Sequence, residues 1–165
     1  LHEQWRKRSV KPIGLSVDPV EAHHKWVDDI EETQTHRPDF PMIADPEARI
    51  ASLYGMIHPE SDPLVTVRAV FVIDPSKKIR LILTYPPSTG RNFQEILRAI
   101  DSLQLTDRQS IATPADWEPG DPVVISPKLS DEEADRQFPQ GYRRMKPYLR
   151  MVYLDNSDHR SQATP

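Results

Sequence analysis

The sequence has 165 residues, a formal net charge of −4 and a hydrophobic content of 37%, so it can form one domain with a core and a small appendage. It has no basic footprint for nucleic acid, and its longest apolar run, residues 69–73, is far too short to span a bilayer. It contains no cysteine, which excludes disulfides, thiolate metal sites and a cysteine nucleophile within these 165 residues.

The first residues predict the later part of a helix. Leu1 and Trp5 are four positions apart, with charged residues between and after them. A domain rarely starts in the middle of a helix, so we expect further residues of this fold upstream of Leu1.

The next segments predict a strand, a helix and a second strand. Residues 10–17 are typical of a strand. Asp18 then predicts the N-cap of a helix and Pro19 its first position, and this helix should end near Glu32. Residues 40–45 predict a short strand. Together these segments indicate a βαβ unit with a right-handed crossover.

The middle of the chain predicts a hairpin with a helix on each side. The signature Asp45-Pro46-Glu47 begins a short helix, for which Gly55 supplies the C-terminal cap. Residues 65–74 and 79–85 predict two strands, and their short connection makes them an antiparallel pair. Residues 93–103 carry apolar side chains at helical spacing. The order predicts an α/β sandwich with a mixed sheet.

The character of the chain changes after Thr106, where long periodic segments end and prolines become frequent. We expect this part to bury little by itself and to pack on the first domain or on another subunit. Three short elements are predicted in it: a strand at 122–126, a helical turn at 130–138 and a strand at 148–154. The predicted organisation is a domain at 1–105, an extension at 106–155 and a disordered tail at 156–165.

Histidines and glycines offer little chemistry. His24 and Asp28 are four apart on a helix, but two ligands are too few for a metal, which favours an exposed helix face. His23 points in another direction, and His58 lies in a loop without an obvious partner. The sequence has neither a nucleophile elbow nor a glycine-rich phosphate loop.

Two arginines are the candidate site residues. Arg68 lies inside the most apolar segment, where a buried guanidinium needs an anion, although a salt bridge at the strand's start or simple exposure also explains it. Arg91 lies near a helix N-terminus, where the helix dipole disfavours a cation unless the side chain points into water. On adjacent elements, the two could form an anion pocket.

Several motifs resemble one protein family. The segment TVRAVFVIDPSKKIRLILTYPPSTGRNFQEILRAIDSLQLT, with KPIGLSVD, PMIADPEARIASLYGM and ATPADWEPGDPVVISP, is similar to the one-cysteine peroxiredoxins that carry a long C-terminal extension. The similarity covers about residues 5–155. It implies a thioredoxin-like sandwich that is incomplete at its N-terminus, followed by a small α+β extension.

The resemblance also implies a chemistry. In the family, an upstream cysteine thiolate attacks a peroxide to give a sulfenic acid, which an external thiol reduces. The arginine matching Arg68 lowers the pKa of that cysteine and helps to orient the peroxide, and Arg91 matches a second arginine close by. The resemblance implies no metal and no organic cofactor, a homodimer with the extension reaching its partner, and a cytoplasmic location.

Three hypotheses therefore stand. The first is a thiol-dependent peroxidase whose cysteine lies upstream of these residues. The second is a truncated, non-catalytic protein of thioredoxin fold that binds partners through its dimer surface, which the absent cysteine suggests. The third is a small anion-binding module that uses Arg68 and Arg91.

Overall fold

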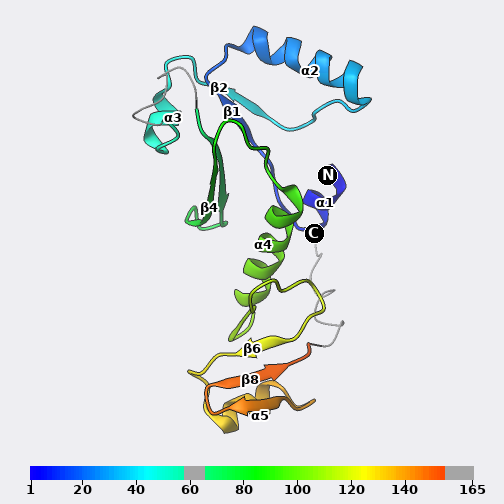
Figure 1. Ribbon diagram of the computed structural model, residues 1–165, viewed down its shortest axis with the longest axis vertical. Coiled ribbons are helices and arrows are strands. Elements are labelled where there is room, and N and C mark those ends of the chain that lie inside the picture. Colours follow the sequence, from blue (N-terminus) through cyan, green and yellow to red (C-terminus); the bar gives the residue numbers. More distant parts are fainter. Residues whose placement is uncertain (58–65, 155–165) are drawn as a thin grey trace. The chain divides into compact units, whose positions relative to one another are not determined.

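The computed structural model describes residues 1–57 and 66–154, which form two compact units (Figure 1). The first unit comprises residues 1–93 and the second begins at Gln94. His58 and the predicted tail at 156–165 lie outside the described residues. The first unit carries, in chain order, α1 (His2–Lys7), β1 (Gly14–Ser16), α2 (Val20–Gln34), β2 (Met42–Ala44), α3 (Arg49–Leu53), β3 (Arg68–Ile73) and β4 (Ile79–Tyr85).

The predicted βαβ unit is confirmed. Strands β1 and β2 are parallel, with Gly14 opposite Met42 and Ser16 opposite Ala44, and α2 connects them. Val27 on α2 is buried. A parallel pair needs such a crossover, because the chain must return to the same end of the sheet before it can pair again.

The predicted ends of α2 were wrong by one or two residues. The N-cap is Pro19, with extended backbone angles and no side-chain cap, and the helix runs on to Gln34 before Thr35 adopts a left-handed conformation. The backbone N–H of Asp18 donates to Ser16 Oγ at 3.3 Å. This bond places Asp18 in the turn after β1 rather than at the N-cap.

Asp45 anchors the start of α3. Its carboxylate is almost fully buried and accepts the backbone N–H groups of Arg49 and Ala51 at 3.0 and 2.8 Å. The N-cap residue is Ala48, in a left-handed conformation, so Asp45 satisfies helix donors from three positions further upstream. The predicted helix signature is therefore confirmed, with the cap position shifted.

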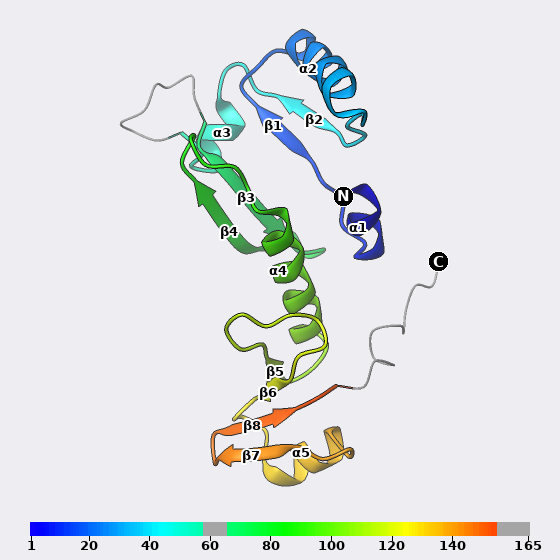
Figure 2. The ribbon, with the colours of Figure 1, turned by 45° about the vertical axis from the view of Figure 1, so that its right-hand side comes forward.

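The predicted hairpin is confirmed. Strands β3 and β4 pair antiparallel, from Arg68 opposite Tyr85 to Ile73 opposite Ile79, with an irregularity near the turn (Figure 2). Tyr54, which follows α3, packs edge-on against Phe71 of β3, with ring centroids 5.1 Å apart.

The second unit is an antiparallel sheet with a helix. The predicted helix at 93–103 is α4, which begins at Phe93 and ends at Thr106, and α5 is capped by Ser130 and Glu133 in a capping box. The four strands lie in the order β5-β6-β8-β7. Its elements are α4 (Phe93–Thr106), whose first residue is the last of the first unit, β5 (Ile111–Ala112), β6 (Val123–Ile125), α5 (Asp131–Gln137), β7 (Arg143–Lys146) and β8 (Leu149–Val152).

The prediction that residues after Thr106 bury little by themselves was wrong. One buried cluster in this unit joins Trp117, Val123, Ile125, Phe138 and Val152 with apolar neighbours. Trp117 and Phe138 are each 2% exposed. The side chains come from separate short elements, so no periodic pattern in the sequence predicted this core.

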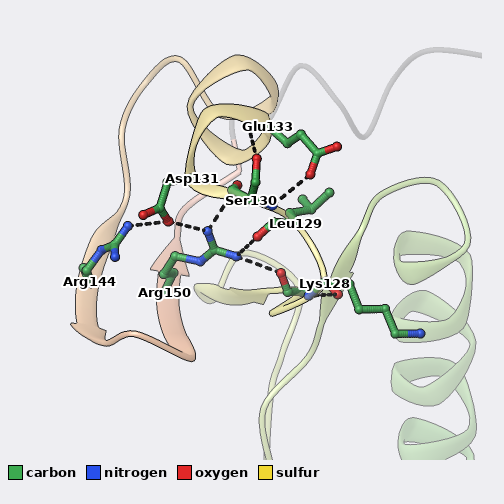
Figure 3. A network of polar contacts seen from close by, with 8 residues as sticks. Lys128, Leu129, Ser130, Asp131, Glu133, Arg144 and Arg150 are labelled. Atoms are coloured by element: carbon green, nitrogen blue, oxygen red, sulfur yellow. Dashed lines mark hydrogen bonds and ion pairs between the residues drawn. The ribbon is translucent and has the colours of Figure 1, made fainter.

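A buried arginine ties the second unit together (Figure 3). Arg150 on β8 is 2% exposed, and its guanidinium donates to the carbonyl oxygens of Ser126, Leu129 and Ser130. It also pairs with the carboxylate of Asp131 at 3.0 Å. Arg150 therefore fixes the loop between β6 and α5 against β8.

Candidate functional site

Arg68 begins β3 at the open end of the hairpin. Its side chain is exposed, and its Nε donates to the carbonyl oxygen of Pro87 at 2.7 Å. Pro87 belongs to the loop that leaves β4. The strand therefore fixes the Cα position of Arg68, and the loop fixes the direction of its guanidinium.

Arg91 lies in the same loop, two residues before α4. Its Nη2 donates to the carbonyl oxygen of Ala69 at 3.3 Å. Partial desolvation of the guanidinium and the positive charge of Arg68 lower the pKa of Arg91 from its ordinary value, and Tyr85 opposes this effect. Arg91 thus experiences the charge of Arg68, and the two cations share one region of the first unit.

The two arginines lack a protein counter-ion in the part of the chain that the structure describes. Neither guanidinium forms an ion pair with a carboxylate among residues 1–57 and 66–154. Both donate only to backbone carbonyl oxygens, which carry no net charge. Two neighbouring guanidinium groups without a carboxylate stabilise an anion placed between them, such as a thiolate or the developing charge on a peroxide oxygen.

The histidines lie elsewhere. His23 Nε2 is 2.6 Å from Ser16 Oγ, a contact that ties α2 to the end of β1 and that the sequence did not predict. Asp28, the other candidate metal ligand beside His24, pairs with Arg37 at 3.1 Å. No three metal-ligating side chains gather among the described residues. No helix in the same residues is long and apolar enough to cross a membrane.

Two family models match the chain. Residues 1–82 match the AhpC/TSA family, and residues 102–141 match the C-terminal domain of 1-Cys peroxiredoxin. The solved structure of a yeast mitochondrial 1-Cys peroxiredoxin superposes with a TM-score of 0.86 at 46% identity, covering 93% of this chain and 75% of that one. The fold is therefore the thioredoxin-like α/β fold of the peroxiredoxins.

Curated relatives define the branch of the family. A 1-Cys peroxiredoxin of Dictyostelium discoideum is 50% identical over 94% of this chain, and the mitochondrial peroxiredoxin PRX1 of Saccharomyces cerevisiae is 49% identical over 92%. The chain belongs to the 1-Cys peroxiredoxin family. It spans 65% and 60% of the lengths of these two relatives.

The expected cytoplasmic location was wrong. The yeast relative at 49% identity and the solved yeast structure are both mitochondrial proteins. Membership of the family therefore does not imply the cytoplasm. The reason is physical: a compartment is set by an address segment, and the fold from which the expectation came does not encode one.

Proposed function

We propose that this protein acts as a thiol-dependent peroxidase of the 1-Cys peroxiredoxin type, with a cysteine supplied by a segment outside these 165 residues. The observation that carries the proposal is the pair formed by Arg68 and Arg91, two guanidinium groups in one region without a described carboxylate partner. Such a pair favours the thiolate over the thiol, and the thiolate is the nucleophile.

The proposed reaction has two stages. The thiolate attacks the terminal oxygen of a hydroperoxide, so that an S–O bond forms and the O–O bond breaks. The leaving oxygen takes a proton and departs as water or an alcohol, and the cysteine becomes a sulfenic acid. An external thiol then displaces water to form a mixed disulfide, and a second thiol releases the cysteine. For the yeast mitochondrial relative, thiol resolution runs through the glutathione and thioredoxin systems.

The two arginines have distinct proposed roles. Arg68, positioned by β3 and by its bond to the Pro87 carbonyl, binds the thiolate and the peroxide oxygen. Arg91, held to the Ala69 carbonyl, adds a second positive charge that stabilises the departing oxygen. Neither role needs a metal or an organic cofactor.

We also propose a domain organisation and a homodimer. Residues 1–105 would form the peroxiredoxin domain and residues 106–155 its extension, which the separate family matches at 1–82 and 102–141 support. Exposed isoleucines on the β3–β4 hairpin, namely Ile73, Ile79 and Ile82, supply apolar surface for a partner subunit.

The test is peroxide consumption by the complete gene product with a thiol reductant. We expect sustained turnover, and the variants Arg68→Gln and Arg91→Gln should lower kcat/KM by about tenfold or more, as expected for lost charge-assisted contacts. Arg49→Gln is the matched control, because Arg49 is an exposed arginine of the same unit that pairs with Glu47. Absence of turnover would overturn the proposal and favour a non-catalytic, partner-binding protein.

A further inference from the structure

The second unit contains an open pocket that the proposed peroxidase does not use. Its cavity volume is about 610 Å³. Its lining comes from residues 106–111, at and after the carboxyl end of α4, and from Gln137 at the end of α5. The loop before α5 contributes Ser126, Lys128 and Leu129. All of these residues belong to the second unit.

Two cations from different segments line this pocket. Arg108 follows α4, and Lys128 belongs to the loop between β6 and α5. Figure 3 shows the Lys128 side chain extending away from the Arg150 network and toward α4. Within residues 1–57 and 66–154, neither cationic side chain has a hydrogen bond or an ion pair. Two free positive charges therefore border the same cavity.

Hydroxyl groups also line the pocket. Ser110 and Ser126 both contribute to the pocket wall. Ser126 Oγ accepts the backbone N–H of Lys128 at 3.3 Å, so its own hydrogen is left to donate to a ligand. Asp107 is the one carboxylate of the lining, and with Arg108 and Lys128 it gives a formal charge of +1. Hydroxyl donors beside cationic side chains suit phosphate oxygens.

Simpler explanations account for only part of this arrangement. A cation at a helix carboxyl end stabilises the helix dipole, which explains Arg108 beside the end of α4. It does not explain Lys128, because Lys128 precedes the amino end of α5, where a helix dipole disfavours a cation. General attraction of anions is not expected either, because the chain carries a formal net charge of −4.

We propose that this pocket binds a small diphosphate-type anion through Arg108 and Lys128. Arg108 and Lys128 come from separate segments of the lining, and a ligand with two anionic groups offers one group to each. Ser110 and Ser126 donate to phosphate oxygens. The pocket is open, so the contacts are partly exposed and the affinity falls as salt screens them.

The test is calorimetric titration of the complete gene product with inorganic pyrophosphate at low ionic strength and without divalent metals. We expect saturable binding of one pyrophosphate per chain. Arg108→Gln and Lys128→Gln should each weaken it about tenfold, as expected for loss of one charged hydrogen bond. Lys128→Arg should restore it. Arg143→Gln is the control, because Arg143 is an exposed cation on β7 that does not line the pocket.

Several outcomes would overturn the proposal. Absence of saturable binding would remove the site, and an equal loss in the Arg143→Gln control would reduce it to general electrostatics. Citrate binding as tightly as pyrophosphate would overturn the assignment to phosphate groups. Circular dichroism of each variant checks that the fold is retained, which we expect because both side chains are exposed.

Discussion

Arg68 and Arg91 hold each other's segments. Arg68 donates to the carbonyl oxygen of Pro87, four residues before Arg91, and Arg91 donates to the carbonyl oxygen of Ala69, the residue after Arg68. Each guanidinium is thus oriented by the backbone that carries the other. These two hydrogen bonds hold the like charges of Arg68 and Arg91 near each other despite their mutual repulsion.

The geometry of the Arg68 guanidinium should matter as well as its charge. Arg68→Lys keeps a positive charge but loses the planar group whose Nε donates to Pro87. We expect kcat/KM for peroxide in the complete gene product to fall by roughly tenfold, because the ammonium lacks the rigid planar fork that orients separate N–H groups toward the loop and the reacting oxygen. Stopped-flow peroxide reduction measures this. Unchanged kinetics would remove Arg68 from the proposed site, and Arg49→Lys serves as the control.

Asp45 should make the first unit sensitive to acid. Backbone hydrogen bonds, first of all from Ala51, lower the pKa of the Asp45 carboxyl from its ordinary value, outweighing the opposing effect of burial. A lowered folded-state pKa means that this stabilisation is complete above the unfolded pKa of about 3.9 and is lost as the pH falls through the folded value.

The Asp45→Asn variant tests this linkage. It should be less stable than the parent at neutral pH, and the difference should shrink below about pH 4, where the parent loses the same contribution. Denaturant unfolding at several pH values measures it. Glu47→Gln is the control, because Glu47 is exposed and pairs with the exposed side chain of Arg49. A difference that stays constant with pH would contradict the prediction.

Arg150 and Arg144 share the carboxylate of Asp131 but should differ in their effect on stability. Arg150 is 2% exposed and bonds three carbonyl oxygens, whereas the Arg144 side chain is 44% exposed. Arg150→Ala leaves buried acceptors without donors and should cost about 3 kcal/mol or more. Arg144→Ala removes an exposed pair and should cost less than about 1 kcal/mol. Equal losses in chemical denaturation would show that burial does not decide the effect.

The capping box of α5 should make a measurable contribution to the free energy of unfolding. Ser130 Oγ accepts the backbone N–H of Glu133, and the Glu133 carboxylate accepts the backbone N–H of Ser130. Ser130→Ala should reduce the free energy of unfolding by about 1 kcal/mol. Ser130 is exposed, so little packing is lost, although its hydroxyl also bonds the Glu132 carboxylate. A double-mutant cycle with Glu133→Ala should reveal coupling, and strict additivity would argue against the reciprocal bonds.

The 165-residue chain expressed alone should associate or dissolve poorly. In the described residues, β1–β2 and β3–β4 are separate two-stranded pairs with free edges, and Ile79 and Ile82 are about half exposed. Unpaired edges and exposed apolar side chains promote association. Sedimentation velocity over a range of concentrations measures this. A well-folded monomer at all concentrations would contradict the prediction.

Local pattern predicted the hairpin and the regular helices. Strand β4 spans Ile79–Tyr85, as its β-branched run between two turns predicted, and the apolar spacing predicted α4. Strands β5 and β7 were missed for opposite reasons. The first has only two residues, and the second is Arg143–Lys146, whose charged side chains lack the alternation that marks a half-buried strand.

The sequence predicted the residues of the candidate site but not their surroundings. The sequence pointed to Arg68 and Arg91 as residue types in unusual places, but it left exposure, a salt bridge and an anion pocket open. The backbone carbonyls that hold them lie 19 and 22 residues away along the chain. Their catalytic roles stay predictions.

The sequence by itself determined the order of elements from β1 to α4, the hairpin and the family, because these depend on short-range periodicity, turn residues and shared motifs. Only the tertiary structure decided that Arg150 is buried and that Trp117, Phe138 and Val152 form one core. Such contacts join residues far apart in the chain, and no local pattern records which distant backbone will meet a given side chain. Arg108 and Lys128 are likewise 20 positions apart in the sequence, and the tertiary structure brings both to the lining of one pocket.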